Sequence, residues 1–247
     1  MLKVELTENY AGVTIYGDYN DLDFLYDSIN YLIHGDPSSD GEYTMQNHLY
    51  GFLYDVRHAY QGQRGAVLID NDLNDNTREW FKFKKKDITD KNICFCFNYL
   101  LPDLFLDMVL INHFIRKVDK KVNDIYNPYI NMVNYFYSLV LYSLENMLTE
   151  IKFNKIKKGL LESVVTDSIF IPQWFEIISI DYSKMSKKQR EKEFMHIMDA
   201  IYNYGDYEDY LKMKIDMQKL CKQKNCSLDD LHYEDYPEEI EWWYENR

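Results

Sequence analysis

Glycine and proline are scarce in this sequence, and the glycine-rich signatures of common enzymes are missing. The 247 residues include 9 glycines and 5 prolines, so short loops are expected. The sequence contains no Gly-x-Gly-x-x-Gly, no phosphate loop with Gly-Lys-Ser/Thr, no Gly-x-Ser-x-Gly and no His-Glu-x-x-His. An enzymatic activity therefore has no sequence signature to support it, and we do not expect the chain to be an enzyme.

Apolar residues, in contrast, are abundant. Hydrophobic residues make up 46% of the chain and aromatic residues 16%, which excludes wholesale disorder because so much apolar surface would collapse. The longest apolar stretch, from Tyr129 to Leu148, is interrupted by polar residues such as Asn134 and Glu145. This pattern favours a buried helix over a transmembrane one, and no membrane partner is expected.

Cysteine is also scarce, and an export signal is missing. Cys94, Cys96, Cys221 and Cys226 form two distant pairs, and the N-terminus MLKVELTENY has no basic head followed by an apolar run. We therefore expect reduced thiols in a cytoplasmic protein. The spacing of Cys221, Cys226 and His232 matches no standard zinc site. Neither a metal nor a cofactor is expected.

Basic residues are outnumbered, 28 against 41 acidic ones, and the charge is unevenly distributed. Residues 1–50 carry nine acids and one lysine, and residues 229–247 carry eight acids and one arginine, whereas residues 151–192 carry nine bases and five acids. An acidic end can dock on the basic middle of the same or a neighbouring subunit, or the basic residues can contact phosphates. A dedicated nucleic-acid binder usually has a basic overall balance, so nucleic acid is not an expected partner.

The N-terminal part alternates between strand and helix patterns. Lys3 to Glu8 and Val13 to Tyr16 predict a hairpin. A helix capped by Asn20 and ended at Gly35 follows, and a second helix is predicted from about Met45 to Tyr60. Three further strands are predicted, the last of them central because both of its faces are apolar: Ala66–Ile69, Trp80–Phe83 and Asn92–Phe97.

The C-terminal half has mainly helical patterns. Helices are predicted from Pro102 to about Lys121, from Pro128 to about Ile151, from Ser186 to Gly205 and from Tyr207 to Lys222. Between Lys158 and Ser186 the pattern is weak. The expected fold is α+β, with a mostly antiparallel sheet in residues 1–125 and a mainly helical portion in residues 126–247, packed as one folded unit.

The second predicted helix carries the candidate site residues. On a helical wheel, His48, Asp55 and His58 lie in a stripe beside the apolar face, where side chains are half buried. Asp55 and His58 are three residues apart, so the carboxylate can orient the imidazole, as a general base requires. Satisfied hydrogen bonds at the edge of the core explain the same residues without catalysis.

Two weaker interpretations concern the same helix. Arg57 and Gln61 lie one turn apart and can contact an anion, although a solvated or ion-paired arginine is the commoner outcome. His48, Asp55 and His58 do not have the spacing of a helical metal site, which places two histidines four residues apart.

The segments ENYAGVTIYGDYNDLDFLYDSI and YDVRHAYQG resemble an uncharacterised family of bacterial proteins, mainly from Gram-positive anaerobes, whose function is unknown. The resemblance covers the N-terminal half of the chain, to about the helix after Pro102. It implies a bacterial cytoplasmic origin and directs attention to Asp55, Arg57, His58 and Gln61.

The sequence favours an interaction or regulatory module that self-associates and that binds a protein partner through its acidic ends and Tyr/Trp-rich surfaces. Trp242, Trp243 and Tyr244 near the C-terminus are typical of a tail that packs on its own core or on a partner. The alternatives are an enzyme or a nucleotide or phosphate binder with a site around Asp55 to Gln61, and nucleic-acid contact through residues 151–192.

Overall fold

Strands lie within the first 100 residues, and helices fill most of the remaining chain. The computed structural model describes residues 1–118, 126–145, 147–165, 169–228 and 231. The elements are β1 (Lys3–Leu6), β2 (Gly12–Gly17), α1 (Tyr19–Ile33), α2 (Asp40–Tyr60), β3 (Gly65–Asp70), α3 (Asp75–Phe83), β4 (Lys91–Leu100), α4 (Leu101–Lys117), α5 (Pro128–Leu144), α6 (Glu150–Glu162), α7 (Ile171–Ser183), α8 (Lys187–Tyr202), the short 3₁₀ helix η1 (Tyr204–Asp206) and α9 (Glu208–Lys224). The predicted α+β class is confirmed.

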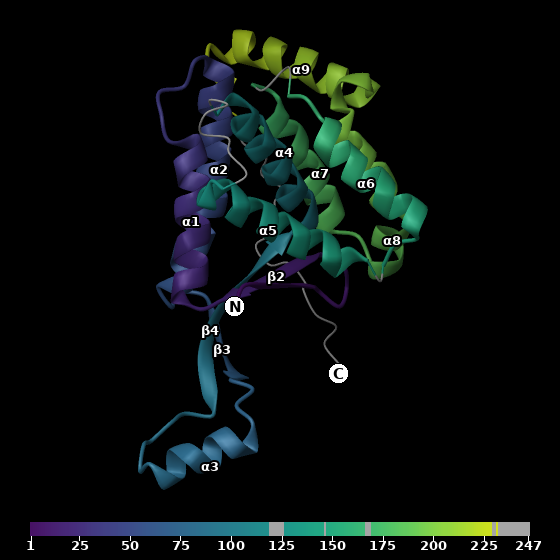
Figure 1. The fold of residues 1–247 in the computed structure, drawn as a ribbon. Coiled ribbons are helices and arrows are strands. Elements are labelled where there is room, and N and C mark those ends of the chain that lie inside the picture. Colours follow the sequence, from purple (N-terminus) through teal and green to yellow (C-terminus); the bar gives the residue numbers. More distant parts are fainter. Residues whose placement is uncertain (119–125, 146, 166–168, 229–230, 232–247) are drawn as a thin grey trace.

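The four strands form one antiparallel sheet in the order β1-β2-β4-β3. The predicted β1–β2 hairpin is confirmed, and so is the interior position of β4. β4 changes partner along its length, because residues 95–100 pair with β2 and residues 91–96 pair with β3. The β3 half of the sheet therefore extends away from the rest of the molecule (Figure 1).

Helices cover the inner face of the sheet, and α4 lies at their centre. Phe52 of α2 contacts both Phe97 and Tyr99 of β4, with ring centroids 6.1 and 5.0 Å apart. α4 contacts α1, α2, α6, α7 and α8, which explains why its sequence is apolar on every side. One hydrophobic core includes side chains from Leu2 to Met217. Within the described ranges, no helix is long and apolar enough to cross a membrane.

Several predicted boundaries are confirmed, and one cap is different. Ser186 begins α8 with the predicted capping box, since its N–H donates to Gln189 Oε1 over 2.8 Å. α1 is capped by Asp18 rather than Asn20, because Asp18 Oδ1 accepts a hydrogen bond from the N–H of Asp21 at 2.9 Å. α2 ends at Tyr60, and Gly62 adopts the left-handed φ of 76° that favours glycine.

Two predictions of local structure are wrong, and a region without a clear pattern proves to be helical. Trp80–Phe83, predicted as a strand, is the end of helix α3, since Asn74 caps it by accepting from the N–H of Thr77 at 2.9 Å. The helix predicted from Pro128 to Ile151 is two helices, α5 and α6. α7 fills the weakly patterned region before Ser186, where apolar residues on most sides obscure the helical period. His232, the acidic tail and its three aromatic residues lie outside the described residues.

We call residues 65–94 the arm. It consists of β3, α3 and the outer part of β4, and it projects from the helical body with α3 at its far end (Figure 1). Every residue of β3 is exposed, and α3 has no buried residue. Two of the three elements of the arm, β3 and α3, therefore bury almost nothing against the described part of the chain.

Arg190 joins the N-terminal hairpin to the C-terminal helices. Its side chain is 2% exposed, and its guanidinium donates hydrogen bonds to the carbonyl oxygens of Asn9, Tyr182 and Ser183 at 2.8 to 3.1 Å. The hydroxyl of Tyr182 donates to the carbonyl of Tyr10 at 2.6 Å. The turn between β1 and β2 is thus held against α7 and α8.

Arg190→Ala is expected to lower the free energy of unfolding by about 3 kcal/mol, because it leaves three carbonyl groups without this donor. Urea denaturation measures the change. Lys188→Ala, an exposed change two residues away, is the control and should stay within about 0.5 kcal/mol of wild type. Equal losses of unfolding free energy in the two variants would contradict the role of Arg190 in joining the hairpin to the C-terminal helices.

Candidate functional site

Asp55 and His58, predicted to form a carboxylate–imidazole pair, each have another partner. Arg64, just past the turn at Gly62, donates from Nη2 to Asp55 Oδ1 at 2.7 Å. Nδ1 of His58 lies 2.8 Å from the carbonyl oxygen of Tyr54, one turn earlier in α2. The chain reverses at Gly62 and brings an arginine to the carboxylate, so the predicted orientation of the imidazole by Asp55 is not seen.

Arg57 and Gln61 lie at the C-terminal end of α2. The guanidinium carbon of Arg57 lies 5.8 Å from the ring centroid of Tyr54, and this ring also contacts His58. Gln61 ends the helix, and its backbone N–H donates to the carbonyl of Arg57 at 3.1 Å. This part of α2 is a surface cluster of stacked and paired side chains, and the anion contact stays a prediction.

His48 points to the interior and meets an acid that sequence reasoning missed. Nε2 of His48 lies 3.3 Å from Oδ1 of Asp107 on α4. The Asp107 side chain is 1% exposed and the His48 side chain 23% exposed. Tyr99 of β4 also interacts with the Asp107 carboxylate. The pair joins α2, α4 and β4 at the centre of the body.

Further polar groups surround the His48–Asp107 pair. Asp103, one turn before Asp107, accepts a hydrogen bond from the hydroxyl of Ser179 on α7. Glu176 of α7 also acts electrostatically on His48. The imidazole is thus surrounded mainly by acidic groups. Among the described residues, no group of three or more His, Cys, Asp and Glu side chains is arranged to hold a metal ion.

Burial alone would lower the pKa of His48, but the nearby carboxylate of Asp107, with the charges of Asp103 and Glu176, raises it above its ordinary value. Burial also raises the pKa of Asp107, and His48 only partly opposes this effect. Both shifts favour the protonated forms. The pair therefore binds protons more tightly in the folded state than in the unfolded state.

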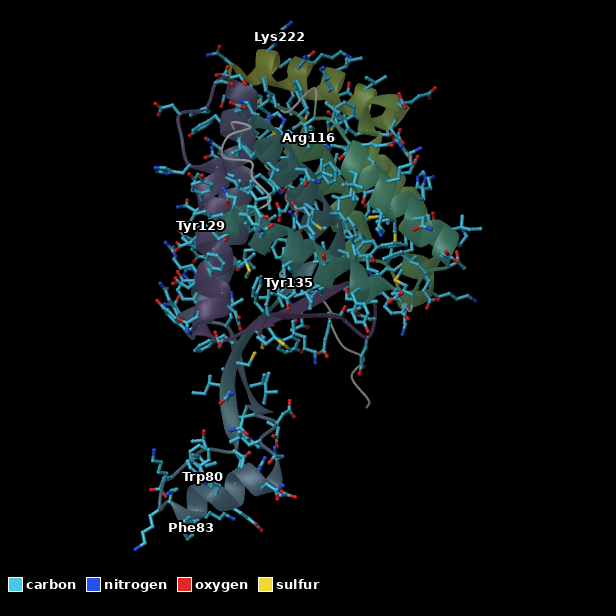
Figure 2. The ribbon with its side chains drawn as sticks, viewed as in Figure 1. Trp80, Phe83, Arg116, Tyr129, Tyr135 and Lys222 are labelled. Carbon is cyan, nitrogen blue, oxygen red and sulfur yellow. The ribbon has the colours of Figure 1, made fainter. Side chains whose placement is uncertain are left out.

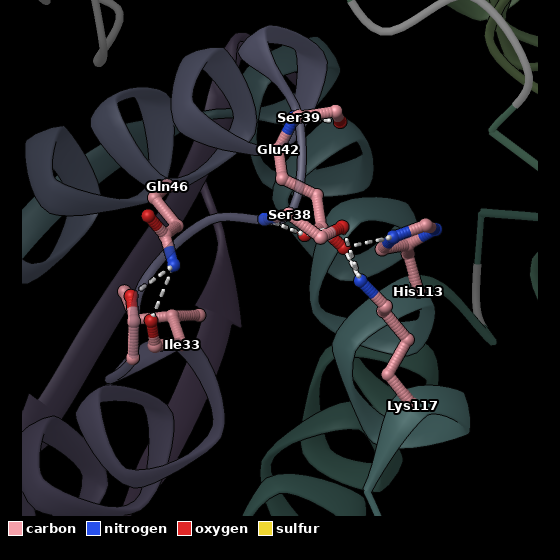
Figure 3. A network of polar contacts seen from close by, with 8 residues as sticks. Ile33, Ser38, Ser39, Glu42, Gln46, His113 and Lys117 are labelled. Carbon is pink, nitrogen blue, oxygen red and sulfur yellow. Dashed lines mark hydrogen bonds and ion pairs between the residues drawn. The ribbon is translucent and has the colours of Figure 1, made fainter.

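A second polar network joins α2 to the end of α4 (Figure 3). The Glu42 side chain is 8% exposed, and its carboxylate accepts from the N–H of Ser38 at 2.7 Å and from the Ser38 hydroxyl at 2.5 Å. Lys117 forms an ion pair with the other carboxylate oxygen, and Nε2 of His113 lies 3.4 Å from it. Burial and the charge of Arg116 lower the pKa of His113, which keeps this imidazole neutral near pH 7.

The Glu42 network borders a cleft of about 360 Å³ between the end of α1, α2 and the end of α4. Tyr31, His34 and Phe114 line it with Glu42 and Lys117. The carboxylate and ammonium groups already bind one another, so the cleft presents a neutralised ion pair. Its most direct role is to fix the start of α2 on α4.

Another cleft, of about 390 Å³, lies between α6 and α8. Lys155 and Asp199 form an ion pair across it at 3.4 Å, and Tyr202 closes one side against Gly159. In the basic segment of residues 151–192, Lys155 is thus already paired and Arg190 is buried. This segment offers less free positive charge than its composition suggests.

The arm presents a group of exposed apolar side chains. Leu68 and Ile93 lie directly opposite one another on β3 and β4 and are 64% and 58% exposed. Trp80 and Phe83, three residues apart on α3 and therefore neighbours on its surface, are 52% and 79% exposed and lie at the far end of the arm (Figure 2). Exposed apolar clusters of this kind are typical of interaction surfaces.

The apolar face of the ribbon continues the inner face of the sheet. Ile93, Phe95, Phe97 and Tyr99 alternate along β4 and therefore point to the same side. Phe97 is 4% exposed under α2, whereas Ile93 is uncovered. The helices that cover the inner face therefore end before the strand does.

Asp107→Asn is expected to cost about 3–5 kcal/mol of unfolding free energy at about pH 6, because it breaks a buried pair. A raised folded-state pKa stabilises the fold below the unfolded value, about 6.5 for histidine, and this contribution is lost as the pH rises. The difference from wild type should therefore shrink between about pH 6 and pH 9. Urea denaturation of wild type and variant across this pH range measures the difference in unfolding free energy. Asp209→Asn, a change at an exposed position, is the control. A difference that grows with pH would contradict it.

Comparison with known proteins gives a family without an activity. No protein with a curated description and no solved structure matches the chain. A family model described as a domain of unknown function, DUF6904, matches residues 2–242. The match includes the segments that carry the resemblance and nearly all of the remaining chain. The chain therefore belongs to the DUF6904 family, a domain of unknown function.

Proposed function

We propose that this protein is a cytoplasmic, bacterial interaction or regulatory module that self-associates, and that the arm makes the contact. The observation that carries the proposal is that none of the described residues buries β3 or α3. β3 and α3 have no buried residue, although Leu68, Trp80 and Phe83 are large apolar side chains. Fully burying one such side chain is worth about 1.5–3 kcal/mol.

The size of the arm supports an external partner. A two-stranded ribbon alone is marginally stable in water, and helices shorter than about 12 residues are marginal as well. The β3–β4 pairing holds the ribbon, and Arg78 ties α3 to it by donating to Asp90 at 2.6 Å and to the carbonyl of Leu73 at 2.7 Å. The ion pairs of Arg78 with the exposed Asp70 and Asp90 contribute little to stability. A covering surface supplies the missing stabilisation.

Charge supports the arm as the contact surface. The arm has six acidic and six basic side chains, while the whole chain has a net charge of −13. Two copies that meet through neutral arms avoid the repulsion that two acidic bodies would produce.

The other two candidate functions stay predictions. An anion site around Asp55 to Gln61 needs a free arginine, but Arg64 pairs with Asp55 and Arg57 lies against Tyr54. Nucleic-acid contact through residues 151–192 needs a continuous basic surface, but Arg190 is buried. The exposed apolar side chains of the arm favour the interaction module over these two functions.

The test is the oligomeric state of wild type and of a variant with both Leu68→Asp and Ile93→Asp. Wild type is expected to sediment as an oligomer, and the variant should dissociate with a Kd raised about tenfold or more, because charges then replace the centre of the contact. Leu161→Asp on α6 is the matched control, since Leu161 is 71% exposed and lies outside the arm. Circular dichroism verifies that each variant is folded.

A wild type that sediments as a monomer at every concentration would contradict the proposal. The same holds if Leu161→Asp dissociates the oligomer as strongly as the arm variant does.

A further inference from the structure

The arm carries two different apolar surfaces that do not cover one another within the described chain. One is the ribbon face formed by Leu68 and Ile93, and the other is the side of α3 formed by Trp80 and Phe83. Arg78 ties α3 to the ends of both strands through Asp70 and Asp90, which holds the helix at the end of the ribbon. Both surfaces stay exposed in the single chain.

A flat apolar sheet face and an apolar helix side are the two halves of a common packing unit. In the body of this protein, α2 covers β4 in this way, with Phe52 over Phe97 and Tyr99. The ribbon face at Leu68 and Ile93 continues the same side of β4 without a helix. An α3 helix from another copy would supply the missing cover.

Basic residues at the far end of the arm and acidic residues at its base match a contact between the α3 helix of one copy and the ribbon face of another. Lys82, Lys84, Lys85 and Lys86 gather where α3 ends, at the far end of the arm. Acidic residues gather at its base, because Gly17 pairs with Phe95 and α1 starts two residues later. The base carries Asp18, Asp23 and Asp27.

The pKa of a neighbouring tyrosine agrees with this placement of the acids. Tyr60, the last residue of α2, packs its ring 5.2 Å from that of Tyr19 at the start of α1. Burial, with the charges of Asp23 and Asp27 nearby, raises the pKa of Tyr60 to about 12. Asp23 and Asp27 are therefore close to the point where the chain leaves α2 for the arm.

We infer that two copies of this chain exchange arms in an antiparallel arrangement, in which α3 of each copy covers the Leu68–Ile93 face of the other. In this arrangement the lysines at the far end of one arm lie over Asp23 and Asp27 at the base of the other. The contact is reciprocal, so it closes as a two-fold dimer and leaves neither surface free for a third copy. This inference rests on the proposed self-association and specifies its partner.

A mixing experiment tests the reciprocal contact. Leu68→Asp damages the ribbon face, and Phe83→Asp damages the helix side. In either variant alone, both halves of the dimer contact are damaged. In a heterodimer of the two variants, one half joins an intact α3 to an intact ribbon face.

The equimolar mixture is therefore expected to form a heterodimer at least about tenfold tighter than the homodimer of either variant, measured by sedimentation with one labelled variant. If wild type is dimeric but the heterodimer binds no more tightly than the homodimer of either variant, the reciprocal contact is overturned. The proposed self-association would then still stand. A monomeric wild type would remove the proposed function itself. Thermal denaturation of each variant shows that loss of folding does not cause the result.

A charge exchange tests the antiparallel arrangement separately. Asp23→Lys with Asp27→Lys, and Lys84→Glu with Lys85→Glu, should each weaken the dimer about tenfold at low salt. All four changes in one chain should restore most of the affinity, because the charges at the far end of each arm and at its base are then both reversed and attract one another again. Failure of the fourfold variant to recover, when both pairs weaken the dimer, would overturn the arrangement.

Discussion

The structure depends on one mismatch: β4 is longer than the layer of helices that covers its inner face. Inside the body, Phe97 and Tyr99 pack under α2 and form part of the core. Two residues further out, Phe95 is half covered, and Ile93 is exposed. An apolar sheet face that extends past its cover gains free energy from any surface that replaces water. The arm, its neutral charge and its amphipathic helix are consistent with this single requirement.

The buried polar groups of the body hold in place the helix that leads into the arm. His48–Asp107 and Glu42–Lys117 both join α2 to α4, one near the middle of α2 and one at its start. α2 leads through Gly62 directly into β3, so its position on α4 and the pairing of β4 with β2 together place the start of the arm. These ion pairs therefore contribute to specificity by holding one arrangement of helices, as buried pairs do in some other proteins.

Local patterns predicted the elements better than the contacts between them. The hairpin, β4 and the capping box at Ser186 follow from neighbouring residues, and each was predictable. The strand prediction for Trp80–Phe83 was wrong because aromatic residues favour strands. The Asn74 side chain caps this segment as a helix instead. The partner of His48 was not predictable, because it lies 59 residues away in an apolar run where an isolated acid was the only signal.

Hydrogen exchange of the arm amides at different protein concentrations tests the central claim most directly. If a second copy covers the arm, amides of β3 and α3 should be protected at high concentration and should exchange faster on dilution, because the dimer then dissociates. Amides of α4, which is buried within one chain, should not change and provide the internal reference. Arm amides that exchange at the same rate at every concentration would contradict the account.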